Sequence, residues 1–191
     1  VQTCALPIYF MDIFSYDIYS KIPSHCDYIT FGMGCFWGAE KRFWTLKDVK
    51  TTIVGYAGGN KENPSYEEVC VGTTGHAEVV KVIFEKNKLP LHTLFKVFWE
   101  SHDPTQLNRQ GNDIGAQYRS AIYVKDKNEL ELAEKSKLSF QKKLNENGFS
   151  KIQTEIKIVK DFFYAEEYHQ KYLYKNPNGY CGLKGLGVEL K

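Results

Sequence analysis

The chain has 191 residues, enough to bury one substantial core and short for two domains. Hydrophobic residues make up 42% of it and charged residues 25%, the balance of an ordinary soluble globular protein. A net charge of +2 without any Lys/Arg block argues against binding to nucleic acid or to a membrane surface. No window approaches about 18 continuous apolar residues, so we expect no transmembrane helix.

The first residues, "VQTCALPIYF", have neither a basic segment nor a small-residue cleavage site, so a signal peptide is not indicated. Because the chain begins with Val, we hypothesise that translation starts at Met11 and that residues 1–10 are not native. We expect residues 1–27 to form an N-terminal extension and residues 28–191 to form a single domain.

In the first half of the chain, strand and helix patterns alternate. Alternating or β-branched apolar residues predict strands, and apolar residues three or four positions apart predict helices. Ser65 precedes a short helical pattern and is its expected N-cap. The expected elements are a strand at 27–34, a helix at 35–46, a strand at 50–59, a helix at 65–70, a strand at 76–85 and a helix at 90–103.

The second half opens with a polar loop at 105–119, and loops of this length are often functional. A strong amphipathic helix follows and is expected to end at Gly148. The tail after residue 176 is rich in glycine and is expected to be irregular. The remaining expected elements are strands at 120–126 and 153–162 and helices at 127–147 and 165–176.

This order of elements predicts one α/β domain, because neither a linker nor a repeat interrupts it. We expect an α+β two-layer sandwich in which helices pack on a mixed sheet. We also expect a ferredoxin-like core and a long irregular C-terminal tail.

The five cysteines have irregular spacing and include no C-x-x-C pair: Cys4, Cys26, Cys35, Cys70 and Cys181. The odd number argues against a secreted disulfide framework, and a zinc site has no paired ligands. Reduced thiols in the cytoplasm are the default for such a chain. We therefore expect a cytoplasmic protein without a bound metal.

The stretch "FGMGCFWGAE" places Cys35 after a strand and a Gly-x-Gly turn, at the start of a helix. Backbone N–H groups at a helix start stabilise an anion, so the pKa of a cysteine there is expected to be lowered. The thiolate is the reactive form of a nucleophilic cysteine. The alternative is a small buried side chain, because free Cys is among the most buried residue types. The residues around Cys35 leave both interpretations open.

Four collinear stretches resemble the A-type peptide methionine sulfoxide reductases: "GCFWGAE" (34–40), "PSYEEVCVGTTGHAEVV" (64–80), "FWESHDPTQLNRQGNDIGAQYRSAIY" (98–123) and "FYAEEYHQKYLYKNPNGYCGLKGLGV" (163–188). Together they cover the chain from about residue 28 to its end. The resemblance implies a single catalytic domain at 28–191 that reduces methionine S-sulfoxide, free or in peptides and proteins, and so repairs oxidised proteins. It implies no bound flavin, metal or haem.

The resemblance implies an acid and two phenols that handle the sulfoxide oxygen. Glu78 in "GHAE" matches the acid, which can donate a proton near neutral pH only if an apolar or crowded site raises its pKa. Tyr66 and Tyr118 match the phenols that hydrogen-bond the oxygen. Asp113 matches a further acid of this network, with a turn residue as the alternative. Taken singly, Glu78 would be a solvent-facing strand residue, and each Tyr a core or rim residue.

Phe36 and Trp37 match the walls that take the methyl group of the substrate, with simple core packing as the alternative for both. Four more residues of the matching stretches are interpreted as structural: His76, His102, His169 and Tyr172.

Cys181 in "GYCG" matches the resolving cysteine of the family, with a stray tail cysteine as the alternative. The resemblance implies that a Cys35 sulfenic acid condenses with Cys181 and that glycines around Cys181 supply the necessary flexibility. Thioredoxin, drawing on NADPH through its reductase, then reduces the disulfide, as dithiothreitol does in vitro. Some relatives carry a third cysteine near the end. Glu189 stands at that position, so the chain resembles the two-cysteine version. Cys70 is interpreted as a packed core thiol.

Two other functions remain to be weighed. A binding module for oxidised, partly unfolded proteins would keep the fold without the chemistry, but Cys35, Glu78 and Cys181 argue against it. A general thiol–disulfide oxidoreductase would use the C-x-x-C pair that is missing. We therefore expect a monomeric reductase whose partners are thioredoxin and oxidised proteins, peptides or free methionine sulfoxide.

Overall fold

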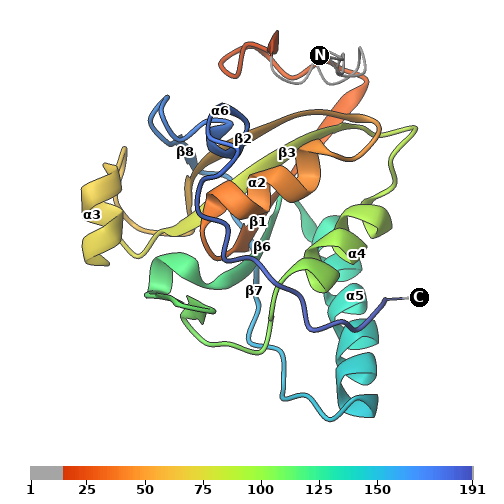
Figure 1. Ribbon diagram of the computed structural model, residues 1–191. Coiled ribbons are helices and arrows are strands. Elements are labelled where there is room, and N and C mark those ends of the chain that lie inside the picture. The colour runs from red at the N-terminus through yellow and green to blue at the C-terminus, as the bar shows by residue number, and fades with distance from the viewer. Residues whose placement is uncertain (1–14, 191) are drawn as a thin grey trace, which may run out of the picture.

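The computed structural model describes residues 15–190, so the hypothesis about residues 1–10 lies outside the described residues. Within that range the chain forms one six-stranded mixed sheet with helices packed on it, and a separate two-stranded hairpin (Figure 1). The strands of the large sheet, in their spatial order, are β7 (Glu155–Ile158), β6 (Ser120–Val124), β1 (Cys26–Met33), β3 (Ala77–Glu85), β2 (Val49–Ala57) and β8 (Phe162–Tyr164).

Four helices form where the sequence predicts them. They are α2 (Phe36–Trp44), α3 (Tyr66–Val71), α4 (Leu91–Ser101) and α5 (Lys127–Glu146). Ser65 caps α3 as predicted, because its hydroxyl accepts the Glu68 N–H while the Glu68 carboxylate accepts the Ser65 N–H. Gly148 follows α5 with a φ of +76°, a left-handed conformation that glycine adopts without strain.

The main hydrophobic core lies between one face of the sheet and the helices α2, α4 and α5. Phe31 of β1 stacks on Phe43 of α2, with ring centroids 4.9 Å apart, and on Phe98 of α4, at 5.1 Å. Val80 of β3 and Phe140 of α5 belong to the same buried cluster. These contacts fix α2 against β1 and β3. Cys35 follows the end of β1, and Glu78 lies at the start of β3.

The sheet is curled, and a short connection shows why. The edge strands β7 and β8 are separated along the chain by residues 159–161 alone. Such a link reaches about 14 Å at most, whereas six strands laid flat would span about 24 Å. The two edges must therefore approach each other. The sequence predicts one strand over 153–162 and misses this division, because β7 pairs in parallel with β6 while β8 pairs antiparallel with β2.

The helix predicted at 165–176 is wrong for most of its length. Helical structure there is confined to α6 (Tyr172–Lys175), and the residues before it form turns. Lys171 has a φ of +53°, which interrupts a right-handed helix. The side chains of Glu166 and Gln170 bind backbone groups of other segments, which offsets the lost helical hydrogen bonds.

The polar loop at 105–119 is ordered by its own side chains. It contains the hairpin strands β4 (Arg109–Gln110) and β5 (Asp113–Ile114) and a 3₁₀ turn, η1 (Ala116–Tyr118). The Asp103 N–H donates to the Gln110 side chain at 3.0 Å. Gln110 packs closely against the backbone of Gly34. A side chain at Gly34 would prevent this, because its Cβ would come within 2.6 Å of the Gln110 Cβ. The loop is thereby fixed against the β1–α2 junction.

The C-terminal tail is irregular, as predicted, but it is docked. Figure 1 shows it leaving α6 and passing α2 toward α4. Leu183 and Val188 are buried in the main core. At Gly185 a Cβ would meet the backbone oxygen of Glu100 at 1.9 Å, so this glycine serves a close approach rather than the flexibility that the sequence suggests.

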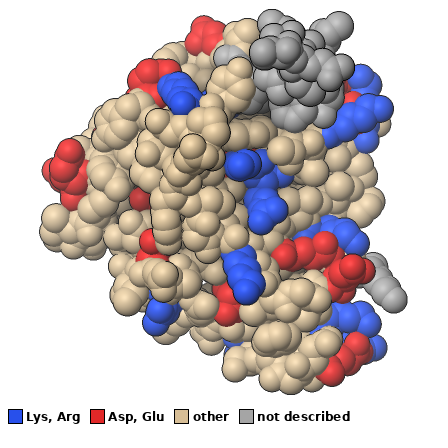
Figure 2. All heavy atoms as spheres, viewed as in Figure 1, with Lys and Arg blue, Asp and Glu red and all other residues tan. Residues whose placement is uncertain are grey.

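Charged side chains of both signs are interspersed over the face drawn in Figure 2. None of the helices within residues 15–190 combines the length and the apolar character needed to cross a membrane.

A buried ion pair fastens the segment before α6 to the rest of the protein. The Lys171 ammonium donates to Glu40 of α2 at 2.9 Å and to the Thr52 carbonyl of β2, and the Lys171 N–H donates to the other Glu40 oxygen at 2.8 Å. Burial raises the pKa of Glu40, while Lys171 and the Thr52 hydroxyl oppose that shift. The pair therefore joins helix, strand and turn in one place.

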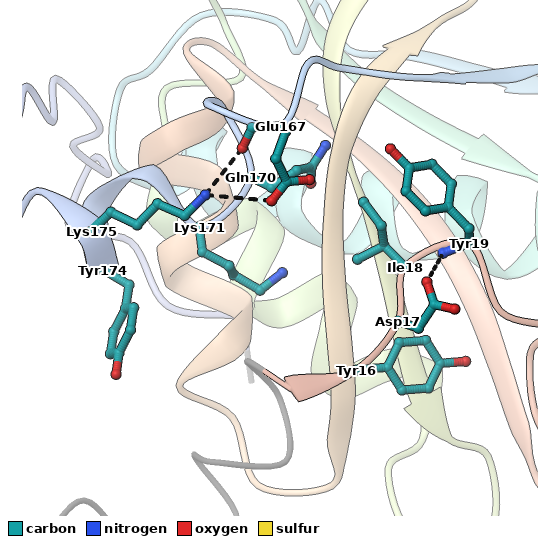
Figure 3. Close-up of a pocket in the computed structure, with 9 residues that line it drawn as sticks. All are labelled: Tyr16, Asp17, Ile18, Tyr19, Glu167, Gln170, Lys171, Tyr174 and Lys175. Carbon is teal, nitrogen blue, oxygen red and sulfur yellow. Dashed lines mark hydrogen bonds and ion pairs between the residues drawn. The ribbon is translucent and has the colours of Figure 1, made fainter.

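Lys171→Ala should lower the free energy of unfolding by about 3–5 kcal/mol, because it leaves the buried Glu40 carboxylate without its cation. The matched control is Lys175→Ala, since Lys175 is close in sequence and contacts Glu167 at the surface (Figure 3). That control should change the free energy by less than about 1 kcal/mol. Urea denaturation measures both. Equal losses in the two variants would contradict a special role for the buried pair.

Candidate active site

Cys35 lies at the junction of β1 and α2. Gly34 before it has a φ of +91°, which turns the chain sharply out of the strand. Cys35 is the N-cap residue of α2, is half-buried, and is a free thiol. The sequence prediction of strand, glycine turn, cysteine and helix is therefore confirmed.

The predicted lowering of the Cys35 pKa is wrong. Burial raises the pKa of the thiol from 9.0 to about 12, and the charge of Glu78 adds to this rise. The N–H groups of Trp37 and Gly38 at the helix start lower it, but by less. Desolvation outweighs the helix terminus here, so the resting site holds a thiol rather than a thiolate.

Glu78 faces into the protein from the middle of the sheet. Its side chain on β3 is 2% exposed, so the interpretation as a solvent-facing residue is excluded. The Phe36 N–H donates to Glu78 Oε2 at 3.0 Å. Burial raises the pKa of Glu78 to about 8, against this hydrogen bond and with a smaller contribution from the charge of Asp113. At neutral pH the group is largely a neutral carboxylic acid, able to donate a proton.

Tyr66 and Tyr118 lie near the same acid. Both are half-buried, and desolvation raises the pKa of each above its usual range. The charge of Glu78 contributes to both shifts, and the charges of Cys35 and Asp113 contribute to that of Tyr118. Both phenols therefore keep their protons and can donate them to an oxygen.

Asp113 is held by a residue that the sequence interpretation did not single out. The Tyr180 hydroxyl lies 3.2 Å from Asp113 Oδ1 and 3.3 Å from Oδ2. Burial raises the pKa of Asp113, and the bond from Tyr180 opposes the rise. Tyr180 precedes Cys181 in "GYCG", and that position next to a candidate cysteine is the signal that could have found it.

The two aromatic residues after Cys35 differ in role. Phe36 is 1% exposed and packs in a small cluster with Tyr56 and Val69, so it is largely core. Trp37 is half-buried and stacks on Tyr172, with ring centroids 3.8 Å apart. Trp37 is thus the more accessible of the two candidate walls.

The second candidate cysteine lies beside the first turn of α2. The Sγ atom of Cys181 would be 3.2 Å from a Cβ on Gly38, so the glycine leaves room for the sulfur. Cys181 is exposed and is a free thiol. The interpretation of Cys70 as a core thiol is wrong, because Cys70 is exposed at the end of α3, where it helps to raise the pKa of Tyr66. Its neighbour Val69 fills the core instead.

The histidines contact the site to different extents. His102 is fully buried, with Nδ1 2.7 Å from the Phe98 carbonyl and Nε2 2.7 Å from the Ser120 hydroxyl, as in a structural residue. His76 is also buried and packs edge-on against Phe163. His169, in contrast, accepts the Trp37 indole N–H. It therefore adjoins Trp37, one of the two candidate walls.

These features define a class of protein. A half-buried thiol, a carboxylic acid kept protonated and two neutral phenols converge near the start of α2, with a second free thiol beside them. In the part of the chain that the structure describes, no cluster of three or more His, Cys, Asp or Glu is placed to hold a metal ion. The arrangement is that of a thiol-based oxidoreductase that protonates an oxygen atom while sulfur attacks next to it.

Comparison with known proteins specifies the class. The family model for peptide methionine sulfoxide reductase matches residues 27–187. The mitochondrial peptide methionine sulfoxide reductase of Homo sapiens is 57% identical over 166 residues, which is 87% of this chain and 71% of that protein. The peptide methionine sulfoxide reductase MsrA of Methylococcus capsulatus is 57% identical over 159 residues, 83% of this chain and 72% of that protein.

Solved structures agree. Reduced Mxr1 from Saccharomyces cerevisiae superposes with a TM-score of 0.79 at 36% identity, over 90% of this chain and 96% of Mxr1. Mxr1 in complex with Trx2 matches with a TM-score of 0.58 at 27% identity, over 81% of this chain and 90% of that chain. The chain belongs to the peptide methionine sulfoxide reductase family, of the MsrA type, and the resemblance seen in its sequence is confirmed.

The raised pKa of Glu78 gives a pH signature. Between its ordinary pKa of 4.5 and its native pKa of about 8, the folded protein holds a proton that the unfolded chain has released. The free energy of unfolding should therefore fall as pH rises through this window, by up to roughly 1.4 kcal/mol per pH unit from this group. Glu78→Gln keeps an oxygen that accepts the Phe36 N–H and removes the titration.

Urea denaturation of both proteins between pH 5 and pH 8.5 measures the effect. The difference in stability between the wild type and Glu78→Gln should shift steadily in favour of the variant as the pH rises. Two curves that stay parallel across the window would contradict the raised pKa.

Proposed function

We propose that this chain reduces methionine S-sulfoxide, free or in peptides and proteins, through a Cys35 sulfenic acid and a Cys35–Cys181 disulfide that thioredoxin reduces. The observation that carries the proposal is the bond from the Phe36 N–H to Glu78. It holds a protonated acid beside the thiol that caps the same helix. Reduction of a sulfoxide requires attack on its sulfur and protonation of its oxygen. Cys35 supplies the attacking thiol, and Glu78 supplies the proton.

In the first step Cys35 attacks the sulfoxide sulfur while Glu78 passes its proton to the oxygen. The Cys35 thiol proton replaces the one that Glu78 has given. The attack forms an S–S bond, and the oxygen, protonated a second time by Glu78, leaves as water. A water molecule then attacks Cys35, displaces the repaired methionine and returns a proton to Glu78. In sum, a thiol and a sulfoxide become a sulfenic acid and a thioether: Cys35 is oxidised by two electrons and the sulfoxide is reduced by two. The burial of Cys35 fits this order of proton transfers. Because its pKa is raised, the Cys35 sulfur becomes nucleophilic only when Glu78, having given up its own proton, takes up the thiol proton.

Tyr66 and Tyr118 donate hydrogen bonds to the oxygen as negative charge develops on it, and Asp113 completes this polar side. Trp37, with Phe36 behind it, contacts the methyl group. Burying a methyl group against an aromatic face is favourable, whereas burying a polar group there without a hydrogen bond is unfavourable. The pocket therefore favours a methyl sulfoxide over a substrate with a polar group at this position.

In the second step the Cys181 thiol attacks the sulfenic acid, which releases water and forms the disulfide. A dithiol then reduces the disulfide and is itself oxidised. The solved complex of the relative Mxr1 with Trx2 supports thioredoxin in this role. The exposed position of Cys181 supports it too, because an attacking thiolate must reach one of the two sulfurs.

The extent of the domain, the fold of its core, and the oligomeric state and cellular location belong to the same proposal. We assign residues 28–191 to one catalytic domain, of which the family model matches the greater part. We classify its core as ferredoxin-like and two-layered, because β6, β1, β3 and β2 lie in the order expected for two βαβ units that share a sheet. We place its action as a monomer in the cytoplasm, where thiols stay reduced.

Cys35→Ser should abolish reduction of a methionine S-sulfoxide peptide by dithiothreitol, because a hydroxyl at this position is a far weaker nucleophile. Chromatography of the peptide products measures the loss, and the R-sulfoxide peptide serves as the negative substrate. Cys70→Ser is the matched control, since Cys70 is also a free thiol near Tyr66, and it should keep reductase activity. Appreciable turnover by Cys35→Ser would move the nucleophile elsewhere.

Cys181→Ser should release about one methionine per enzyme molecule and then stall with thioredoxin, because the sulfenic acid no longer finds its partner thiol. Quenched-flow product analysis gives the first turnover, and NADPH consumption coupled through thioredoxin reductase gives the steady state. Cys70→Ser again provides the comparison and should turn over continuously. Sustained thioredoxin-driven turnover by Cys181→Ser would show that another thiol resolves.

A further inference from the structure

The segment Glu166–Lys171, named here the 166–171 turn, contacts β2 and two elements that carry candidate site residues, α2 and α3. We propose that it sets the geometry of the substrate pocket, with Glu166 positioning Tyr66 on the oxygen side and His169 positioning Trp37 on the methyl side. This inference rests on the proposed function and adds two positioning residues to it. Neither side chain is assigned a contact with the reacting atoms.

The 166–171 turn is firmly anchored. The Gln170 side chain accepts the Val54 N–H at 3.0 Å and donates to the Val54 carbonyl at 2.9 Å, so it completes the hydrogen bonding of β2. Lys171 forms the buried pair with Glu40 of α2. Figure 3 shows both side chains beside the outward-facing pocket that Tyr16–Tyr19 line, a pocket that contains none of the candidate site residues. A segment fixed at β2 and α2 can hold other groups in place.

Glu166 anchors Tyr66 on the oxygen side of the pocket. One carboxylate oxygen accepts the Tyr66 N–H at 3.0 Å, and the other accepts the Tyr56 hydroxyl at 2.8 Å. Tyr66 is the first residue of α3, a helix of six residues in which Val69 is the buried one. So short a helix has little intrinsic stability and depends on such contacts with other segments for its position. The bond from Glu166 therefore holds the backbone from which the Tyr66 phenol extends.

His169 anchors Trp37 on the methyl side of the pocket. The Trp37 indole N–H donates to His169 Nδ1 at 3.1 Å. Because Nδ1 accepts this hydrogen bond, the ring is neutral and its proton is on Nε2. The His169 ring is 1% exposed and lies 4.6 Å from the Tyr66 ring and 5.0 Å from the Phe36 ring, centroid to centroid. Trp37 is thus fixed between His169 on its N–H edge and Tyr172 on its face.

The two sides make different predictions, which separates positioning from mere stability. Displacing Tyr66 should slow the chemical step, because the phenol stabilises charge that develops only in the transition state. Displacing Trp37 should alter the choice between a methyl and a larger alkyl group, because it changes the shape of an apolar wall. A variant that acted only through stability would affect both properties in proportion.

For the oxygen side we would measure single-turnover reduction by Glu166→Ala, Tyr66→Phe and the double variant. Glu166→Ala should slow the step about tenfold or more. In the Tyr66→Phe background the same change should add less than about twofold, because the phenol it positions is already gone. Glu167→Ala, at the exposed neighbouring carboxylate that contacts Lys175, should leave the rate unchanged.

If Glu166→Ala unfolds at the assay temperature, Glu166→Asp replaces it, since the shorter side chain cannot reach both partners and keeps the charge. Losses that multiply in the double variant, or a Glu166 variant within twofold of the wild type, would overturn the oxygen side of the proposal. The wild-type rate alone tests the proposed function, and the cycle alone tests the positioning, so the two can fail separately.

For the methyl side we would compare kcat/KM for methionine sulfoxide and for its S-ethyl homologue. His169→Leu removes the acceptor for the Trp37 N–H and should reduce the preference for methyl by about fivefold or more. His169→Asn places an amide oxygen near the position of Nδ1 and should restore most of that preference. Equal behaviour of the Leu and Asn variants, or an unchanged preference in both, would overturn this assignment.

Discussion

The hydrogen bond between the Phe36 N–H and the Glu78 carboxyl joins the two halves of the site. One partner belongs to the start of α2 and the other to the start of β3. These elements meet because β1 and β3 are neighbours whose register pairs Phe31 with Val80, which brings Glu78 level with the end of β1. The same bond keeps the Glu78 carboxyl at the first turn of the helix that Cys35 caps, so the sheet and the helix together hold the proposed nucleophile and the proposed acid close to each other.

The competition between burial and the helix terminus decides the protonation of this pair. A helix terminus contributes typically 0.3–1 kcal/mol at the surface, whereas burial of a charge raises the pKa of an acid by several units. Both Cys35 and Glu78 follow burial, with pKa values raised to about 12 and about 8. A site that holds both protons at rest suits a reaction in which one proton goes to the sulfoxide oxygen and the other replaces it.

Sequence patterns predicted the elements whose signals are local. Ser65 as a cap, Gly148 as a helix end and the strand–turn–helix around Cys35 all depend on neighbours along the chain, and all were found. What failed depends on distant residues. The strand β8 exists because β2 offers a free edge, and the residues before α6 leave the helix because Glu166, Gln170 and Lys171 find better partners elsewhere. The Cys35 pKa failed for the same reason, since burial comes from segments far away in sequence. The site residues could be named only through the family resemblance.

The docked tail limits how the proposed disulfide can form. Leu183 is buried in the main core, and the Leu190 N–H and carbonyl bind Glu100 and Lys96 of α4. The chain before residue 176 is held by α6 and by the 166–171 turn. Cys181 therefore lies on a short span between two fixed points, close to Gly38. The residue before Cys181, Tyr180, donates its hydroxyl to Asp113, so any movement of Cys181 acts on a neighbour of that hydrogen bond. The polar side of the proposed pocket and the proposed resolving thiol are therefore linked through the adjacent residues Tyr180 and Cys181.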